Sequence, residues 1–324
     1  MRILGREVLE AVLPPADVIA AVERAFRETA AGRAAALPRA VLPMGRHGVF
    51  LAMVSALPRL GALGTKLVTV VERNQRRGLP TIHATYLLTD PETGAPLALM
   101  EAGFLTAIRT GATSAVAARY LARPDSRVVA CFGAGVQARF QLLCLSQVLP
   151  LAEVRVVGRN PQRAAAFAER MGDELGIAVR VAASRKAAVT GADVITCATT
   201  ASKPVFSGRD VGAGTHVDGV GTFRPATREI DTLTVKGSRV VVDTYEGAWG
   251  EAGDLLIPIK AGAITRRHIR ADLAELVAGT RRGRTSPEQI TLFKSVGYAA
   301  EDAVTARLAY DRAVTAGLGT EVAL

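Results

Sequence analysis

The chain has 324 residues, of which 49% are hydrophobic, so it is long enough to bury a large core and two domains are expected. Its formal net charge of +10 suits either nucleic acid or small anionic ligands. Only six of the 40 basic residues are lysine, and the aromatic-basic interleaving typical of nucleic-acid binding is missing; Arg163, Arg170, Arg185, Arg228 and Arg307 are spread singly through helices and turns. We therefore expect no nucleic-acid partner.

The longest apolar runs are far shorter than the ~20 residues that a membrane span needs. The N-terminus lacks a signal-peptide pattern, so we expect a cytoplasmic protein with no membrane partner. The three cysteines, Cys131, Cys144 and Cys197, lie in predicted buried elements and lack metal-like spacing. This predicts reduced core residues and no metal site.

The N-terminal third combines one helix with several strands. Apolar positions recur at helical spacing over residues 17–31, and Gly32 follows as a stop. Turn residues at 90–94 predict an antiparallel hairpin between the last two strands. A helix over residues 108–122 then leads out of this α+β domain. The predicted strands cover residues 39–42, 49–57, 64–71, 81–89 and 97–101.

Polar residues within these apolar elements are the candidates for chemistry. Lys66 shares a strand face with Val68 and Val70, and lysine is rarely buried without a partner. The alternative is an edge-strand lysine that discourages aggregation. Thr81 begins the next strand. Arg109 lies near the start of the expected helix, where a solvent-facing charge is the alternative.

A strand, a glycine turn and a helix follow one another from residue 127 to 149. The apolar run 128–132 is short and β-rich, as in a buried parallel strand. The Gly-x-Gly-x-x-Ala turn would let backbone approach a pyrophosphate at the helix N-terminus. We assign the cofactor's phosphates to this turn, with Gly133, Gly135, Val136, Gln137 and Ala138 as the binding residues.

Strands and helices alternate from this turn onward, which predicts a Rossmann-type doubly wound parallel sheet. Asn160 is a suitable N-cap for a helix with Pro161 at its first position and Gly176 as its stop. Thr199 and Val220 lie at the ends of two of the strands and are assigned to the cofactor site. Further strands are predicted over residues 154–157, 178–181, 192–198, 216–220 and 239–243, and a short helix over 184–189.

The end of the second strand of this sheet indicates which dinucleotide is bound. An acid there would accept the ribose hydroxyls of NAD, but Arg159 and Asn160 stand there instead, and Arg163 lies one turn further on. Arginine suits a 2′-phosphate, so we predict NADP, with NAD as the alternative. The competing interpretation is that Arg159 stacks on adenine or faces solvent.

Five segments in order carry a family resemblance over nearly the whole chain. They are residues 37–43, 65–69, 106–115, 132–138 and 291–297, followed by Glu301 and Asp302. On these segments the chain resembles the ornithine cyclodeaminase/mu-crystallin family. The resemblance implies an α+β substrate-binding and dimerisation domain from residues 1–118 plus 297–324, and an NAD(P)-binding Rossmann domain over 119–296. It also implies that a final helix over about 295–316 returns to the first domain, and that the protein is a homodimer with a shared barrel-like interface.

The resemblance also implies site residues. Arg39, Lys66 and Arg109 match the family's substrate pocket, and Thr110 its contact toward the cofactor phosphates. Two guanidinium groups can hold a carboxylate, and a desolvated lysine can orient or protonate the group at the α-carbon. We therefore assign Lys66 and Arg109 to catalysis and place Thr81 with them in the substrate site. Ser295 and Val296 match contacts close to the nicotinamide.

One position departs from the cyclodeaminases of this family. Phe223 stands where they have an aspartate that handles the substrate's amino groups, and a phenyl ring cannot replace a carboxylate. We therefore expect an NAD(P)H-dependent reductase of a cyclic ketimine such as pyrroline- or piperideine-2-carboxylate, with a small anionic imine or amino acid as partner. The alternatives are ornithine cyclodeaminase, an alanine dehydrogenase-like oxidoreductase, and a non-catalytic NADPH binder. Asp218 or Asp231 could compensate for the missing carboxylate.

Overall fold

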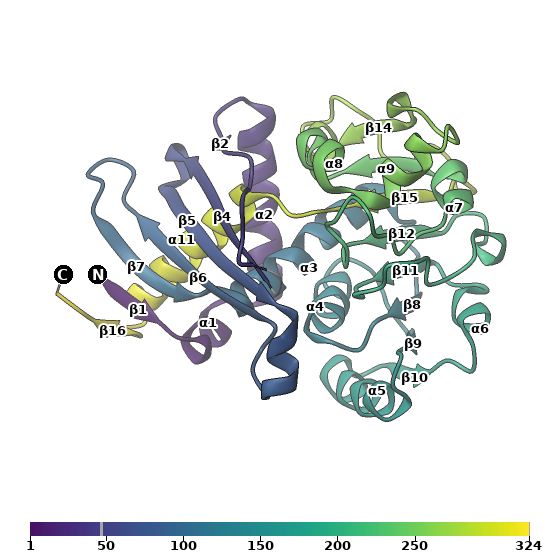
Figure 1. The fold of residues 1–324 in the computed structure, drawn as a ribbon, viewed down its shortest axis with the longest axis horizontal. Coiled ribbons are helices and arrows are strands. Elements are labelled where there is room, and N and C mark those ends of the chain that lie inside the picture. Colours follow the sequence, from purple (N-terminus) through teal and green to yellow (C-terminus); the bar gives the residue numbers. More distant parts are fainter. Residues whose placement is uncertain (46–47, 324) are drawn as a thin grey trace. The chain divides into compact units, whose positions relative to one another are not determined.

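The chain forms two compact units (Figure 1). The structure, a computed structural model, describes residues 1–45 and 48–323. The first unit joins Met1–Arg109 to Tyr298–Leu324, and the second comprises Thr110–Gly297. Helix α3 (Ala102–Leu121) carries the chain from one unit to the other, and the division between the units falls within this helix, after Arg109. The roles of the units in substrate binding, dimerisation and cofactor binding stay predictions.

The first unit is built on an eight-stranded, mostly antiparallel sheet with the order β16-β1-β7-β6-β5-β4-β2, in which β3 also pairs with β4. The pairing of β6 with β7 confirms the predicted hairpin. Strand β1 runs parallel to β7, and β16 closes that edge, so the two ends of the chain share one sheet. The strands are β1 (Arg2–Leu4), β2 (Ala35–Ala36), β3 (Ala40–Pro43), β4 (Gly48–Leu57), β5 (Ala62–Val71), β6 (Ile82–Thr89), β7 (Pro96–Glu101) and β16 (Thr320–Glu321).

Helices α1 (Arg6–Val12), α2 (Pro15–Ala30) and α11 (Ala299–Thr315) belong to the same unit. Helix α11 packs on α2 and on strands β4 and β5 (Figure 1). The expectation of a helix from residue 295 was wrong by four residues. Residues 291–294 form a buried strand hydrogen-bonded on both sides, which fixes them in extended conformation.

Helix α3 begins six residues earlier than the predicted start at 108. The carboxylate of Glu101 accepts hydrogen bonds from the backbone N–H groups of Gly103 (2.6 Å) and Phe104 (2.9 Å). These bonds satisfy donors that a helix start leaves unpaired. Arg109 therefore lies inside the helix and not at its entrance.

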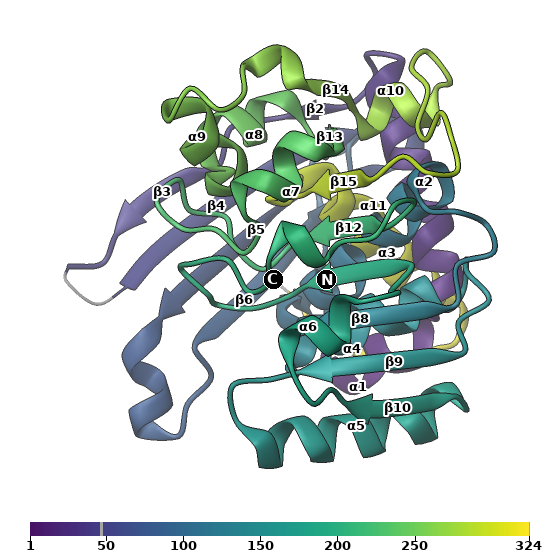
Figure 2. The ribbon, with the colours of Figure 1, turned by 90° about the vertical axis from the view of Figure 1, so that its right-hand side faces the viewer.

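The second unit contains eight parallel strands in the order β10-β9-β8-β11-β12-β15-β13-β14 (Figure 2). The chain leaves β10 at one edge and resumes at β11, on the other side of β8, so a topological switch point lies between β8 and β11. This order confirms the doubly wound prediction. The strands are β8 (Val128–Phe132), β9 (Glu153–Val157), β10 (Ala178–Val181), β11 (Val194–Cys197), β12 (His216–Gly219), β13 (Arg239–Val242), β14 (Ile269–Asp272) and β15 (Thr291–Lys294).

Apolar clusters cover both faces of this sheet because side chains alternate along each strand. Val129 and Cys131 belong to one cluster, and Ala130 and Phe132 to the other. The predicted caps of α5 are present, since Asn160 accepts from the N–H of residue 163 and Gly176 is left-handed. The helices are α4 (Val136–Leu145), α5 (Pro161–Leu175), α6 (Arg185–Val189), α7 (Thr232–Gly237), α8 (Tyr245–Glu251), α9 (Gly253–Lys260) and α10 (Leu273–Val277).

The cysteines are free and buried, as predicted for core residues. Burial raises the pKa of the Cys131 thiol to about 12. Over residues 1–45 and 48–323, no helix combines the length and apolar character needed to cross a membrane. In the same part of the chain, no group of three or more His, Cys, Asp or Glu side chains is arranged to hold a metal ion.

Candidate active site

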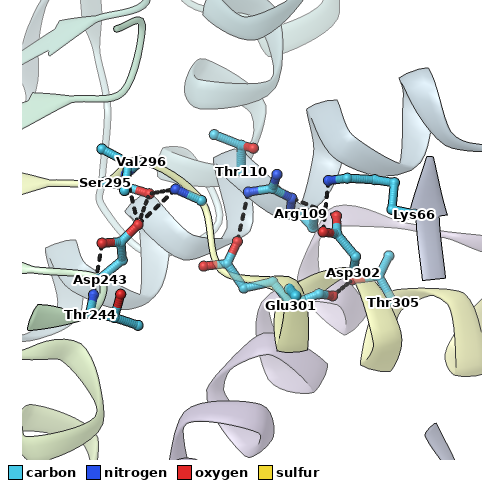
Figure 3. Close-up of polar contacts among 12 residues, drawn as sticks. Lys66, Arg109, Thr110, Asp243, Thr244, Ser295, Val296, Glu301, Asp302 and Thr305 are labelled. Carbon is cyan, nitrogen blue, oxygen red and sulfur yellow. Dashed lines mark hydrogen bonds and ion pairs between the residues drawn. The ribbon is translucent and has the colours of Figure 1, made fainter. Parts of the chain in front are cut away.

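Lys66 is a buried charge in the middle of the first unit's sheet. Strand β5 is paired on both sides, by β4 and by β6, so the edge-strand interpretation of Lys66 was wrong. The side chain lies on the buried face of the strand and is only 1% exposed. Its Nζ donates a hydrogen bond to Oδ2 of Asp302 at 2.7 Å (Figure 3). The lysine thus has the partner that burial requires.

Arg109 makes two ion pairs with the start of helix α11. Its Nε donates to Oδ1 of Asp302 at 2.9 Å, and its Nη1 donates to Oε2 of Glu301 at 2.8 Å (Figure 3). Arg109 is 5% exposed, so the solvent-facing interpretation was wrong. Asp302 therefore joins Lys66 and Arg109, using one carboxylate oxygen for each.

The two carboxylates lie where a helix stabilises anions. Glu301 and Asp302 are in the first turn of α11, where unpaired N–H groups and the helix dipole favour negative charge. Burial alone would raise the pKa of Asp302, but Arg109 and Lys66 outweigh it and hold this pKa below its ordinary value. Asp302 is therefore ionised at neutral pH.

Burial has the opposite consequence for the lysine. Desolvation is the main cause that lowers the pKa of Lys66, Asp302 opposes it, and the charges of Arg109 and Arg39 act in the same direction as desolvation, so that the pKa is about 8. Arg39 lies directly before β3 and is half-buried. Three cations face two carboxylates in this cluster, which leaves one positive charge. Such a site suits a small carboxylate ligand.

Thr81 is the assigned substrate residue that the sheet does not bring to this cluster. Lys66 pairs across the sheet with Tyr86, and Thr81 lies five residues before Tyr86, next to the start of β6. At ~3.4 Å per residue this is ~17 Å along the strand. Arg39, Lys66 and Arg109 remain as the substrate-side candidates of the first unit.

The glycine turn between β8 and α4 fits a bound pyrophosphate. Gly133 has φ +121°, and a Cβ there would lie 2.5 Å from the carbonyl oxygen of Ala198. At Gly135, the N-cap of α4, a Cβ would meet no described atom within 4 Å apart from those of its own residue and its chain neighbours. No side chain of the described residues caps the first N–H groups of this helix, which suits an anion.

Three further residues of the turn differ in burial. Val136, the first residue of α4 after the turn, is 56% exposed. Gln137 is partly buried, and Ala138 is fully buried and packs on the sheet. Thr110, 8% exposed, has its carbonyl oxygen 3.3 Å from Nε2 of Gln141 on α4. These residues and both glycines lie within the second unit.

Basic side chains follow strand β9. Arg159 is exposed, and its Nη2 lies 3.4 Å from Oγ1 of Thr200. Arg163 is also exposed, on the first turn of α5, and its backbone N–H is bonded to Asn160. The position that decides between the two dinucleotides thus carries positive charge and no carboxylate.

One buried carboxylate joins the loops that follow β11 and β12. Glu229 is fully buried and accepts from the N–H and Oγ1 of Thr199 and from the N–H of Gly221, each at 2.7 Å. Burial raises the pKa of Glu229. Val220, beside Gly221, donates its N–H to the carbonyl of Cys197. The ends of two adjacent strands, where doubly wound sheets bind ligands, are thereby fixed to each other.

A second buried carboxylate organises the segment after β15. Oδ2 of Asp243 accepts from Oγ of Ser295 at 2.8 Å and from the N–H groups of Val296 and Gly297 at 2.7 and 2.8 Å (Figure 3). Ser295 directly follows β15 and lies four residues before the first residue of α11. Its hydroxyl and the backbone beside it are held in one orientation.

Of the two aspartates that could compensate for Phe223, Asp231 has hydrogen-bond partners, whereas neither carboxylate oxygen of Asp218 has one among the described residues. Asp231 caps α7 through the N–H of Thr234 and also accepts from the N–H of Gly208. Asp218 is fully buried within β12, with Oδ1 3.3 Å from Nε2 of His216. Phe223 packs partly buried against an apolar cluster of the second unit.

Sequence reasoning missed the carboxylates that position these groups. Glu301 and Asp302 were noticed without a role, because acids in a first helical turn are common and usually exposed. A usable signal is that the same turn continues into the apolar run Ala303-Val304, which is buried. The sequence indicates the positioning roles of Asp243 and Glu229 less clearly, because each is a single acidic residue next to a strand or turn.

Comparisons with known proteins agree with this architecture over the whole chain. A model of the ornithine cyclodeaminase/mu-crystallin family matches residues 4–317. The Delta(1)-pyrroline-2-carboxylate reductase of Bacillus thuringiensis subsp. konkukian is 37% identical over 308 residues, which cover 94% of each chain. The Thermococcus litoralis Delta(1)-pyrroline-2-carboxylate reductase, solved with NADH and L-proline, is 46% identical with a TM-score of 0.97 and covers 99% of this chain and 100% of its own. An archaeal alanine dehydrogenase dimer with bound NAD has a TM-score of 0.94 and 34% identity, covering 100% and 99%.

Proposed function

This chain belongs to the ornithine cyclodeaminase/mu-crystallin family, and we propose that it reduces a cyclic ketimine next to a carboxylate, such as pyrroline- or piperideine-2-carboxylate, to an L-amino acid. The observation that carries the proposal is the buried Lys66, held by Asp302 beside Arg109 and near Arg39. Such a cluster offers a proton donor and guanidinium groups for a carboxylate. The similarity to two pyrroline-2-carboxylate reductases supports the choice of substrate.

Reduction of a C=N bond needs one hydride and one proton. The hydride would come from the nicotinamide cofactor and would add to the ring carbon that bears the carboxylate. Arg39 and Arg109 hold the carboxylate, and the ammonium of Lys66 gives its proton to the ring nitrogen. The π pair of the C=N bond becomes the new N–H bond, and the neutral lysine then takes a proton from water. Positioning and charge stabilisation supply the rate enhancement.

We assign the cofactor to the second unit and favour NADPH. Gly133, Gly135, Val136, Gln137 and Ala138 would hold the pyrophosphate. Arg159 and Arg163 would pair with the 2′-phosphate. Thr110 would contact the phosphates, and Asn160 would contact the adenosine part of the cofactor. The nicotinamide part would be bound by Thr199, Val220, Ser295 and Val296.

A homodimer is part of the proposal. The face of the first unit's sheet opposite Lys66 carries exposed apolar side chains, among them Leu67 and Leu87, which are 41% and 36% exposed. Apolar patches of this kind favour a protein partner. The similar archaeal alanine dehydrogenase is a dimer, which favours a second copy of this chain as the partner. Sedimentation velocity of wild type measures the mass directly.

One alternative activity has its own support. The 34% identity to an archaeal alanine dehydrogenase makes oxidation of alanine with NAD the second candidate. Ornithine cyclisation is less favoured, because Phe223 supplies no carboxylate and Asp231 is engaged in capping α7.

The test is the rate of NADPH oxidation with pyrroline-2-carboxylate, in wild type and in Lys66→Ala. Loss of the proton donor should lower kcat by about 10²- to 10⁴-fold. Lys260→Ala, which removes an exposed lysine at the end of α9, is the matched control and should retain activity. NAD reduction by alanine without imine turnover would favour the second candidate. Ammonia release from ornithine would refute the assignment based on Phe223.

A further inference from the structure

We propose that Asp302 is a positioning residue that keeps Lys66 charged and correctly oriented, so that the acid of the reaction is the Lys66–Asp302 pair and not the lysine alone. This assignment rests on the proposed function, since it explains how that function's proton donor is maintained. Nothing in the family resemblance gives Asp302 this role.

The geometry shows how completely the lysine depends on this carboxylate. Lys66 and Asp302 are each 1% exposed, and Nζ lies 2.7 Å from Oδ2. The strand partners of Lys66 are Met53 on β4 and Tyr86 on β6. Burial and the charge of Asp302 raise the pKa of Tyr86, so this phenol is neutral across the working pH range. Neither strand neighbour offers a compensating negative charge.

The other charged groups near Lys66 oppose its charge or pair elsewhere. Arg109, from α3, and Arg39, before β3, both lower the pKa of Lys66. Glu301, from α11, binds Nη1 of Arg109. Asp302 is thus the anion whose contact favours the ammonium form. The same carboxylate binds Nε of Arg109, so it also fixes the lysine relative to a guanidinium that would hold the substrate.

Removing the charge of Asp302 should therefore discharge Lys66 near neutral pH. With Asp302 present the pKa of Lys66 is about 8. An opposite charge within ~4–6 Å shifts a pKa by ~1–3 units. In Asp302→Asn the pKa of Lys66 should fall by about one unit or more, to 7 or below. The lysine would then be largely neutral above pH 7 and unable to donate.

The competing explanation is that Asp302 only ties α11 to β5 and α3. A purely structural role predicts lower activity by the same factor at every pH. The positioning role predicts a shift along the pH axis. A shift of one unit lowers the protonated fraction about tenfold at pH 9 but by less than twofold at pH 6. The direction of the reaction gives a second discriminator, because amino-acid oxidation needs neutral Lys66 and should rise at lower pH in Asp302→Asn.

The first measurement is the pKa of Lys66 itself, which needs no substrate. The chain has only six lysines, so ¹³C NMR of Cε-labelled lysine gives few signals, and Lys66→Met identifies the relevant one. Wild type should titrate near pH 8 and Asp302→Asn at least one unit lower. Glu301→Gln is the matched control: it removes a carboxylate from the same turn that binds Arg109 but not Lys66, and should cause a clearly smaller shift. Asp302→Glu should restore most of the wild-type value.

Kinetics complete the test. The descending limb of kcat/KM for imine reduction should move to lower pH in Asp302→Asn, with activity near pH 6 largely retained. An unchanged Lys66 pKa, or an equal loss of activity at all pH values, overturns the proposal. If Asp302→Asn does not fold, wild type and Asp302→Glu still decide, because a Lys66 that is neutral at pH 7 in both contradicts it. If wild type reduces no imine, the proposed function fails, while the NMR titration still decides the role of Asp302.

Discussion

Replacing Arg109 with methionine tests whether the charges at the start of α11 behave as a buried network. The substitution keeps an unbranched side chain in α3 but removes the cation that contacts Asp302 and Glu301 at 2.9 and 2.8 Å. Both carboxylates are at most 1% exposed and cannot turn to bulk water. Removing one partner of a buried ion pair costs about 3–5 kcal/mol, because the remaining charge is left uncompensated. Arg109→Met should lower the free energy of unfolding by this amount at pH 7.

The loss of unfolding free energy caused by Arg109→Met should decrease as the pH falls. Burial raises the pKa of Asp302, but Arg109 and Lys66 outweigh it and hold this pKa below its ordinary value, so the unfolded chain binds more protons near pH 4. The stabilisation from Asp302 is therefore present above the ordinary aspartate pKa and is lost as pH falls through the folded value. Arg109→Met raises the folded pKa, so the difference between variant and wild type should shrink as the medium is acidified from pH 6 toward pH 4.

A surface pair provides the control for this measurement. Arg27 contacts Glu23 at 2.7 Å, as short as the buried contacts, but its side chain is 61% exposed. Such pairs contribute only about 0.3–0.5 kcal/mol, so Arg27→Met should be nearly neutral. Urea unfolding followed by circular dichroism gives the free energies, and the fluorescence of Trp249 reports on the second unit separately. If the losses of unfolding free energy in Arg109→Met and Arg27→Met differ by less than about 1 kcal/mol, the reasoning is refuted.

Three further predictions concern the cofactor side. Arg159→Ala should weaken NADPH binding by about 10- to 100-fold, since a hydrogen bond to a charged group contributes about 1.5–3 kcal/mol. Fluorescence titration should show NADH binding almost unchanged, and equal losses for both cofactors would contradict the assignment. Gly133→Ala should abolish cofactor binding in calorimetry because its Cβ meets the carbonyl of Ala198, whereas Gly176→Ala, also at positive φ but without that contact, should bind normally. Asp243→Ala should raise the KM for the cofactor more than it lowers kcat, because it releases three donors just after β15; a fall in kcat alone would argue against it.

The second unit could be predicted well because its elements carry local signals. Short β-rich runs separated by capped helices predicted the first six parallel strands of the unit, β8 to β13, and the helix that Asn160 begins. Strands β14 and β15 were missed. Each has only four residues, and β15 owes its extended conformation to hydrogen bonds with β12 and β13, which are distant in sequence. Tertiary pairing of this kind leaves little trace in a local pattern.

The predicted start of α3 was wrong because it is determined by a capping side chain and not by the spacing of apolar residues. Glu101 closes the start of α3 through two backbone N–H groups, and its position in the sequence resembles the end of a strand as much as a cap. As a result Arg109 was expected at a helix entrance and lies in its interior. The residue type of Arg109 indicated a possible functional role. Its burial could not be predicted, because the predicted start of α3 was six residues too late.

In the candidate site, the sequence indicates that a single residue needs a partner, but it does not identify that partner. Lys66 in an apolar strand predicts that some partner exists, because an unpaired buried ammonium is too costly. It does not say which of the 30 acidic residues supplies the partner. Asp302 lies 236 residues away and becomes the partner because α11 returns to pack on β5. That return also places the carboxylate at a helix N-terminus, where it stays ionised between two cations. The charge state of Lys66 is therefore set jointly by the sheet that buries it and by the last helix, and the proposed role of Lys66 as an acid depends on both.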